Sequence, residues 1–488
     1  MSIILNKLIL LLFIIISLVV SFNAAAATLK YYEEYEHDRV YKLPGQPKSP
    51  IVSQFSGYIT VNEAHGRALF YWFFEAQSHS TIKPLLLWLN GGPGCSSIGF
   101  GAALELGPLK VAQKGDALEF NHHAWNKEAN LLFVESPVGV GFSYTNTPDD
   151  FKHLDDKFVA EDTYNFLVKW LNKFPQYKGR EFFVSGESYA GHYVPQLAEL
   201  IHDRNEGKNK YPYINLKGLI VGNPETSEYF DYKGILEYAW SHAVISDQNY
   251  YKAKRTCDFK KVYWSNECVT AMEMLWAQYS DIDMYNIYAS SCLLNQTTSF
   301  FDRENAFSIT ANNLRRNRSV LRRGKWAPGG YDPCYSVYIE KYFNRRDVQK
   351  ALHITNFRKH GDNLKWKACN DSMFFETYNM DVFSVLPIYT KLITKQGLKI
   401  WMYSGDADGR VPVISSRYCV EALQLPLKAN WTSWFYNNQV AGRIIEYEGL
   451  TFVTVRGAGH MVPFDKPNEA FALIRSYLSD QPLPTRRY

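Results

Sequence analysis

Short apolar runs that end in glycine-rich or acidic turns recur along this chain, and they constrain the fold more than any other feature. The clearest runs are residues 85–89, 130–134, 181–185, 216–221, 398–403 and 450–455. Continuous apolar runs of this length are typical of strands buried on both faces of a parallel sheet. Amphipathic stretches between some of them, such as 155–174 and 193–203, predict connecting helices. The alternation of strand and helix therefore predicts an α/β fold.

The turn at 186–191 (GESYAG) follows one apolar run and precedes a helical stretch. Such a position is typical of a nucleophile elbow, in which a sharp turn holds a serine hydroxyl clear of the backbone. Ala190 stands where the pattern expects glycine, but it is still small. An ordinary turn with a helix-capping serine has the same local sequence, so the motif alone leaves Ser188 as a candidate nucleophile.

A serine nucleophile needs a base, and hydrolase folds of this kind place serine, acid and histidine in that order along the chain. Asp406 and Asp408 end one predicted strand, and His460 follows the last one. Because serine, acid and histidine each stand at a strand end in the required order, they predict a catalytic triad. The spacing alone does not choose between Asp406 and Asp408.

The loop at 90–94 (NGGPG) follows the first apolar run and predicts an oxyanion hole. Glycine lets the backbone approach a tetrahedral intermediate, and the residue after the nucleophile supplies a second N–H group. We expect the backbone N–H groups of Gly92 and Tyr189 to be the two donors. A phosphate-binding loop is disfavoured, because no Lys-Ser/Thr pair follows the glycines.

The chain resembles the serine carboxypeptidase family over nearly all of the region after its N-terminal segment. The matching segments are 88–97 (WLNGGPGCSS), 105–108 (ELGP), 135–144 (ESPVGVGFSY), 186–195, 404–412 and 457–463. Residues 331–334 and 342–353 are most similar to the plant carboxypeptidase II branch. The resemblance implies an α/β-hydrolase fold, with a mostly parallel central sheet flanked by helices and an inserted cap region. It also implies that the acid of the triad is Asp408.

The resemblance further implies an exopeptidase that works at acidic pH and needs no metal or cofactor. In the family, an asparagine, two glutamates and a backbone N–H recognise the terminal carboxylate of a peptide. The matching positions are Asn90, Glu105, Glu187 and Gly91. Phe100 matches a position that walls the pocket for the C-terminal side chain.

Two alternative functions remain open. An acyltransferase branch of the family keeps the triad, but those relatives usually lose the asparagine before the glycines and the glutamate before the serine. This chain keeps both, as Asn90 and Glu187. A catalytically inactive hydrolase-fold binding protein is the other alternative, and the intact set of Ser188, Asp408 and His460 argues against it.

The N-terminus predicts export. Lys7 precedes an apolar run that ends in small residues, so residues 1–27 are predicted to be a cleaved signal peptide. The destination is the extracellular space or the vacuole. Four sequons predict glycosylation, at Asn295, Asn317, Asn370 and Asn430. Seven cysteines agree with an oxidising compartment. The resemblance pairs them as Cys95–Cys369, Cys257–Cys268 and Cys292–Cys334, which leaves Cys419 over.

The predicted domain organisation has two core parts around one insertion. Residues 28–230 and 381–488 form the hydrolase core, and 231–380 form the cap region. Within the cap, 312–326 is a basic linker with paired arginines. The chain has 53 basic and 49 acidic residues, and this balance gives no reason to expect nucleic acid as a partner. The expected partner is a peptide or protein with a free C-terminus, without membrane attachment after signal removal, and a homodimer remains open.

Overall fold

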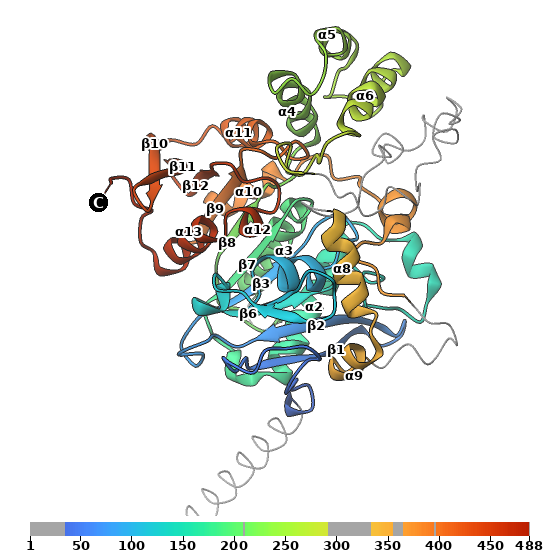
Figure 1. The fold of residues 1–488 in the computed structure, drawn as a ribbon, viewed down its shortest axis with the longest axis vertical. Coiled ribbons are helices and arrows are strands. Elements are labelled where there is room, and N and C mark those ends of the chain that lie inside the picture. The colour runs from blue at the N-terminus through green and yellow to red at the C-terminus, as the bar shows by residue number, and fades with distance from the viewer. Residues whose placement is uncertain (1–34, 208–209, 291–332, 355–364, 395–396, 488) are drawn as a thin grey trace, which may run out of the picture.

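A computed structural model describes residues 35–207, 210–290, 333–354, 365–394 and 397–487 of the chain (Figure 1). The predicted signal peptide, 1–27, and the predicted basic linker, 312–326, lie outside these residues. In the part of the chain that is described, no helix is long and apolar enough to cross a membrane.

One large sheet forms the centre of the molecule. The strands are β1 (Gln54–Asn62), β2 (Arg67–Phe74), β3 (Leu85–Leu89), β4 (Leu109–Val111), β5 (Leu118–Phe120), β6 (Asn130–Val134), β7 (Phe182–Glu187), β8 (Leu216–Gly222), β9 (Lys399–Gly405), β10 (Leu427–Tyr436), β11 (Gln439–Tyr447) and β12 (Leu450–Val455). The large sheet has ten strands in the order β1-β2-β6-β3-β7-β8-β9-β12-β11-β10, and β4 pairs separately with β5.

The middle of the sheet, from β6 to β12 in this order, is parallel. Its strands are the ones that the apolar runs predict. At each edge the sheet continues with antiparallel strands, β1 and β2 on one side and β11 and β10 on the other. The mostly parallel sheet of the predicted α/β-hydrolase fold is therefore confirmed.

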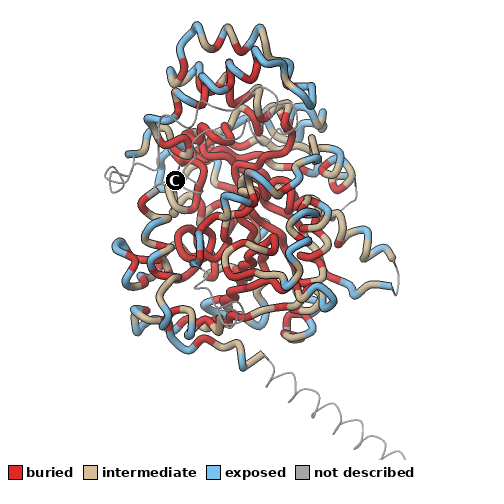
Figure 2. Tube along the Cα trace, turned by 90° about the vertical axis from the view of Figure 1, so that its right-hand side faces the viewer, coloured by how far each residue is buried: buried red, intermediate tan, exposed pale blue. Residues whose placement is uncertain are grey.

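Most of the helices cover the two faces of the sheet, and the others form a separate cluster. The helices are α2 (Asp156–Lys173), α3 (Ala190–Glu206), α4 (Glu228–Ser241), α5 (Asp247–Thr256), α6 (Asn266–Tyr279), α8 (Pro333–Phe343), α9 (Arg346–Ala351), α10 (Leu386–Thr394), α11 (Val413–Ala422), α12 (Val462–Asp465) and α13 (Pro467–Ser479), with a shorter helical segment η1 (Ile98–Glu105) after β3. Figure 2 shows that the buried residues concentrate along the sheet and the helix faces that touch it.

Side chains of the central strands alternate between two hydrophobic clusters, as the period of a β-strand requires. Leu85, Leu87 and Leu89 of β3 belong to the cluster that contains buried residues of α2, α3 and α10. Leu86 and Trp88 belong to the cluster on the opposite face, with η1, α8 and α13. Because these strands are buried on both faces, their sequences are continuous apolar runs.

The segment that the sequence predicts as an inserted cap divides into two parts by its packing. Helices α4, α5 and α6 form a hydrophobic cluster of their own and stand together at the top of Figure 1. The chain after α6 contacts the carboxyl ends of two strands. The backbone N–H of Ile287 donates to Ala407 O at 3.0 Å, and that of His460 donates to Tyr285 O at 2.7 Å.

The later part of this segment packs on the sheet. Buried residues of α8 and α9, such as Ile339, Tyr342 and Val348, belong to the same cluster as Trp72 of β2. In Figure 1 these two helices flank the sheet, apart from α4–α6. The segment 231–380 is thus two structural parts, one beyond the ends of the strands and one beside the core. Its predicted boundaries as a domain stay a prediction.

Candidate active site

Ser188 lies in the turn between β7 and α3 with a positive φ of 64°. Residues other than glycine rarely adopt this conformation, and it is the strained turn expected of a nucleophile elbow. Both flanking glycines are required by close packing. A Cβ on Gly186 would lie 2.4 Å from Leu89 O, and one on Gly191 would lie 2.2 Å from Glu225 O. The elbow is therefore held between two neighbouring loops.

His460 and Asp408 meet at the carboxyl ends of two adjacent parallel strands, β12 and β9. Nδ1 of His460 lies 2.6 Å from Oδ2 of Asp408, which is fully buried. The other carboxylate oxygen of Asp408 accepts hydrogen bonds from the backbone N–H groups of Arg410 at 2.7 Å and Val411 at 3.1 Å. Ser188 and His460 line the same cavity. The structure thus brings the three predicted triad residues to one place, with Nδ1 of the histidine engaged by the acid.

The structure separates the roles of Asp406 and Asp408, between which spacing did not choose. Oδ1 of Asp406 accepts a hydrogen bond from the backbone N–H of Gly457 at 2.6 Å, which joins the turns after β9 and β12. Sequence reasoning missed Asn223, whose Nδ2 donates to Oδ2 of Asp408 at 2.8 Å. The available signal was its place in the turn directly after β8.

The loop after β3 lies against the elbow. A Cβ on Gly91 would be 2.4 Å from the backbone N of Tyr189, so only glycine allows this approach. Gly92 has a φ of 114°, in the region that favours glycine, and a Cβ there would be 2.7 Å from Gly94 N. The predicted oxyanion donors, Gly92 and Tyr189, therefore belong to two segments in direct contact. Their role as donors stays a prediction.

Asn90 links the two predicted carboxylate-binding glutamates. Its Nδ2 donates to Oε1 of Glu187 at 2.9 Å and to Oε1 of Glu105 at 3.3 Å. Its Oδ1 accepts hydrogen bonds from Trp88 Nε1 at 2.8 Å and from the backbone N–H of Gly101 at 3.1 Å, so the orientation of the amide is fixed. Asn90, Gly91 and Glu187 line the cavity with Ser188, and Glu105 reaches it through Asn90.

The two glutamates hold protons more strongly than ordinary carboxyl groups. Burial raises the pKa of Glu105 to about 7, against the weaker opposing effects of hydrogen bonds and of His460 and Lys110. Burial, followed by the charge of Glu105, raises the pKa of Glu187 well above its usual value. Two carboxylates in a desolvated site disfavour each other's ionisation. The pair therefore carries at least one proton at acidic pH and can donate hydrogen bonds.

Aromatic and charged side chains complete the wall of the cavity. Phe100, which the resemblance assigns to the pocket wall, is buried and lines it. Tyr285 also lines it, with its ring centroid 5.1 Å from that of His460. Arg410 lines it as well and forms a buried ion pair with Glu225. Sequence reasoning missed both: Tyr285 stands in no motif, and Arg410 lies in the segment 404–412 but has no role in the triad.

A buried carboxylate at the start of α2 anchors the side of the elbow away from the cavity. Asp156 accepts hydrogen bonds from Tyr189 Oη at 3.0 Å, Tyr378 Oη at 2.8 Å and Gln196 Nε2 at 2.7 Å, and it lies 3.0 Å from His192 Nδ1. Burial alone would raise the pKa of Asp156, but the contact with His192 and the other hydrogen bonds lower it. The side chain of Tyr189 is thereby fixed next to the nucleophile.

The structure contains two of the implied disulfides, Cys95–Cys369 and Cys257–Cys268. Both cysteines of the first pair line the cavity. Cys334 is disulfide-bonded, but Cys292 lies outside the described residues, so that pairing stays a prediction. Cys419 is a buried free thiol.

Two of the four predicted glycosylation sites lie among the described residues. Asn295 and Asn317 lie outside the described residues, and Asn430 is exposed on the edge strand β10. Asn370 lines the cavity, and its Nδ2, the atom that would carry a glycan, donates to Gly139 O at 3.0 Å. A glycan there would leave Nδ2 a single N–H and would place the sugar against the cavity. The prediction of glycosylation therefore fits Asn370 poorly.

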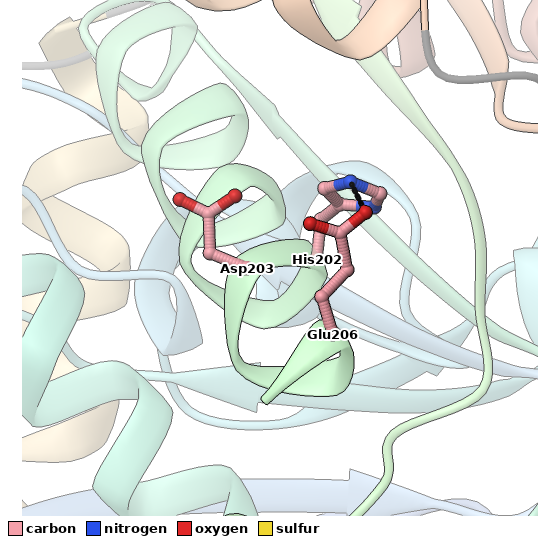
Figure 3. A group of neighbouring side chains, drawn as sticks. All are labelled: His202, Asp203 and Glu206. Atoms are coloured by element: carbon pink, nitrogen blue, oxygen red, sulfur yellow. Dashed lines mark ion pairs between the residues drawn. The ribbon is translucent and has the colours of Figure 1, made fainter. Parts of the chain in front are cut away.

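One group of possible metal ligands, His202, Asp203 and Glu206, lies in the last turns of α3 (Figure 3). Nε2 of His202 pairs with Oε1 of Glu206 at 3.4 Å, and Figure 3 shows the carboxylate of Asp203 beside this pair, with the ligand atoms of all three residues within 4.8 Å of one another. Oδ2 of Asp203 pairs with Lys391 Nζ at 2.8 Å. Ion pairs on the helix surface account for these side chains, and none of the three is among the described residues that line the cavity around Ser188.

Two comparisons of the sequence with known proteins give the same family. The family model described as serine carboxypeptidase matches residues 44–480. Serine carboxypeptidase-like 26 of Oryza sativa subsp. japonica is 60% identical over 459 residues, which cover 93% of this chain and 92% of that protein. Serine carboxypeptidase-like 33 of Arabidopsis thaliana is 57% identical over 459 residues, with 93% and 94% covered.

A solved structure supports the fold. The prohormone-processing carboxypeptidase Kex1(delta)p from Saccharomyces cerevisiae superposes with a TM-score of 0.72 and 23% sequence identity, over 91% of this chain and 96% of that one. The family match spans both core parts and the segment between them. The chain belongs to the serine carboxypeptidase family of α/β-hydrolase enzymes.

Proposed function

We propose that this protein hydrolyses the C-terminal peptide bond of peptides and proteins through an acyl-enzyme intermediate on Ser188. The observation that carries the proposal is the meeting, around one cavity, of an elbow serine, a histidine–aspartate pair and a pair of buried carboxyl groups. The serine, histidine and aspartate are the parts that acyl transfer needs. The carboxyl pair adds a means to recognise a free C-terminus.

Each triad residue has one role in the proposed reaction. Ser188 Oγ attacks the last peptide carbonyl while Nε2 of His460 takes the hydroxyl proton. His460 then gives that proton to the departing amino acid, and a water molecule repeats the steps on the ester. Asp408 holds the imidazole through Nδ1 and stabilises its positive charge. The N–H groups of Gly92 and Tyr189 stabilise the oxyanion.

The proposed site for the substrate carboxylate is formed by groups that line the cavity together with Ser188. Asn90 Nδ2, a protonated Glu187 and the backbone N–H of Gly91 are the proposed donors. Because the glutamates must keep protons to donate, binding is strongest at acidic pH and weakens as the pH rises past the pKa of about 7 at Glu105. An acidic compartment of the secretory pathway, such as the vacuole, meets this requirement. Disulfides such as Cys257–Cys268 are typical of proteins in an oxidising compartment, which agrees with the secretory pathway.

A digest of a peptide mixture tests the proposal. Free-acid peptides should lose residues one at a time from the C-terminus, as read by mass spectrometry. Peptides of the same sequence with an amidated C-terminus should be cut more slowly. Ser188→Ala should lower kcat by several orders of magnitude, because the triad acts as a unit. Cleavage at internal bonds, or full activity in Ser188→Ala, would contradict the proposal.

An acyltransferase of the same family is the second candidate, because the relatives are named carboxypeptidase-like without a stated substrate. The retained contacts of Asn90 with Glu187 and Glu105 favour the peptidase, since these groups suit a carboxylate. Incubation with a glucose ester and an alcohol acceptor separates the two functions. Transfer to the alcohol that exceeds peptide hydrolysis would establish the acyltransferase instead.

A further inference from the structure

Three adjacent parallel strands place Glu187, Gly222 and Tyr403 in one row across the sheet. Glu187 of β7 is paired with Gly222 of β8, and Gly222 is paired with Tyr403 of β9. Paired residues of neighbouring strands point to the same face of a sheet. The side chains of Glu187 and Tyr403 therefore lie on the same face, separated by a residue that has no side chain.

Gly222 leaves room for the ring of Tyr403, because glycine has no side chain. A Cβ on Gly222 would lie 2.4 Å from Cζ of Tyr403 and 2.5 Å from its hydroxyl oxygen. The phenol ring therefore lies over β8 and reaches from β9 toward β7. Because adjacent strands are only about 4.8 Å apart, a ring in this position brings its hydroxyl next to the side chain of Glu187.

Three buried oxygen atoms in this region receive no hydrogen bond from the described residues, apart from the hydrogen bond that the two glutamates share with each other. They are the hydroxyl of Tyr403, Oε2 of Glu187 and Oε2 of Glu105. The charges that act on Tyr403 belong to the same two glutamates, which together with burial raise its pKa well above the usual value. Buried polar groups in native proteins are nearly always paired, directly or through ordered water.

We propose that Tyr403 is a positioning residue of the carboxyl pair, and that its hydroxyl donates to one buried water molecule that in turn donates to Glu187 and Glu105. Three oxygens of this kind are enough to hold a single water, which makes two to four hydrogen bonds at buried sites. The inference deepens the proposed carboxylate-binding role of the pair and rests on it. Tyr403 itself does not touch the substrate.

The expected consequence concerns the ionised pair. The water donates hydrogen bonds to the carboxyl oxygens, which favours their charged form. Because the hydroxyl of Tyr403 holds this water in place, the hydroxyl lowers the pH at which the pair gives up its proton. The other charged groups that act on the pair are His460, Lys110 and Asp408. None of them is altered when the hydroxyl of Tyr403 is removed.

The experiment compares Tyr403→Phe with wild type by the Michaelis constant as a function of pH. For a free-acid peptide, the pH at which KM begins to climb should move upward by roughly half a unit to one unit in Tyr403→Phe, the size of one hydrogen bond. The kcat should stay within about twofold, because the triad is unchanged. For the matched amidated peptide, the profile should not move.

Tyr389→Phe is the matched control. Tyr389 is also fully buried with an unpartnered hydroxyl, but it belongs to the cluster on the opposite face of the sheet. Its removal should leave the KM profile in place. An unmoved or lowered midpoint in Tyr403→Phe, or an equal shift in Tyr389→Phe or with the amidated peptide, overturns the inference. If the wild-type protein has the same KM for the free-acid and the amidated peptide at every pH, the carboxylate-binding role of the pair is overturned. The inference about Tyr403 then fails as well.

Discussion

Glu105 and Glu187 come from different segments of the chain and accept hydrogen bonds from the same amide nitrogen, Nδ2 of Asn90, at 3.3 Å and 2.9 Å. Both are buried, at 1% and 3% exposure, and Glu187 opens onto the cavity beside Ser188. A pair of carboxyl groups in so dry a place is stable only when protons remain on it. Because the protonation of this pair changes with pH, the affinity for the substrate carboxylate should change with pH too.

Glu187→Gln should weaken the binding of free-acid peptides at acidic pH by about tenfold and flatten the rise of KM toward neutral pH. Glutamine keeps an N–H donor, but an amide N–H is a weaker donor to a carboxylate than a carboxylic O–H, so part of one hydrogen bond to a charged group, worth roughly 1.5–3 kcal/mol, is lost at acidic pH. Glutamine cannot lose a proton, so the rise of KM toward neutral pH becomes flatter. The measurement is KM from pH 4 to pH 8 for matched acid and amide peptides. A variant that keeps the wild-type pH profile for the acid peptide would contradict the role of Glu187.

Gly91→Ala should lower kcat by about 10²- to 10³-fold, the usual effect of losing one oxyanion donor. The added methyl group would lie 2.4 Å from Tyr189 N, where it blocks that N–H and displaces the loop of Gly92. Gly179→Ala is the control, because nothing lies within 4 Å of a Cβ at that position, although its φ of 77° adds local strain. Single-turnover acylation rates, together with melting temperatures, separate loss of catalysis from loss of fold. Normal acylation in Gly91→Ala would exclude Tyr189 N–H as a donor.

Asp156→Asn should destabilise the protein by about 3 kcal/mol and slow acylation as well. The change removes the charged partner of His192 and weakens the anchor of Tyr189, and breaking a buried ion pair is strongly unfavourable. Burial would lower the pKa of His192, but Asp156 raises it, so the pair stabilises the fold at acidic pH and the contribution is lost as the pH rises through that pKa. Denaturant unfolding of wild type and Asp156→Asn at pH 5 and pH 8 measures the loss of stability at each pH. An equal loss at both pH values would argue against the ion pair.

Stability should fall as the pH rises from about 5 to 8. Burial raises the pKa of Glu105, Glu135 and Asp465 to about 7 and that of Asp231 to about 8. A carboxyl whose pKa is raised in the folded state contributes stability that is complete below the pKa of the unfolded chain, and this contribution is lost as the pH rises through the folded value. The melting temperature should therefore drop by several degrees over this range. Glu105→Gln should make the drop smaller, and a melting temperature that rises toward pH 8 would contradict this account.

The parallel centre of the sheet is predictable from the sequence alone. Strands β6, β3, β7, β8, β9 and β12 are buried on both faces, and this leaves a continuous apolar run that local reading detects. The edge strand β10 is largely exposed and polar, so it carries no such run. The order of Ser188, the aspartates and His460 was equally readable, because each stands at the end of a central strand.

Which side chains meet across the sheet is not predictable from the sequence, because it depends on how the strands and helices pack. Local sequence could not separate Asp406, which bonds Gly457, from Asp408, which bonds His460, because both end the same strand. The anchor at Asp156 and the tyrosine at Tyr403 were not found from the sequence, because nothing in their local pattern differs from that of an ordinary helix start or core strand. Their partners come from other elements, so their contacts exist only once helix packing and strand register are fixed. Side chains acquire such roles from neighbours that are distant along the chain, and local sequence patterns do not record those neighbours.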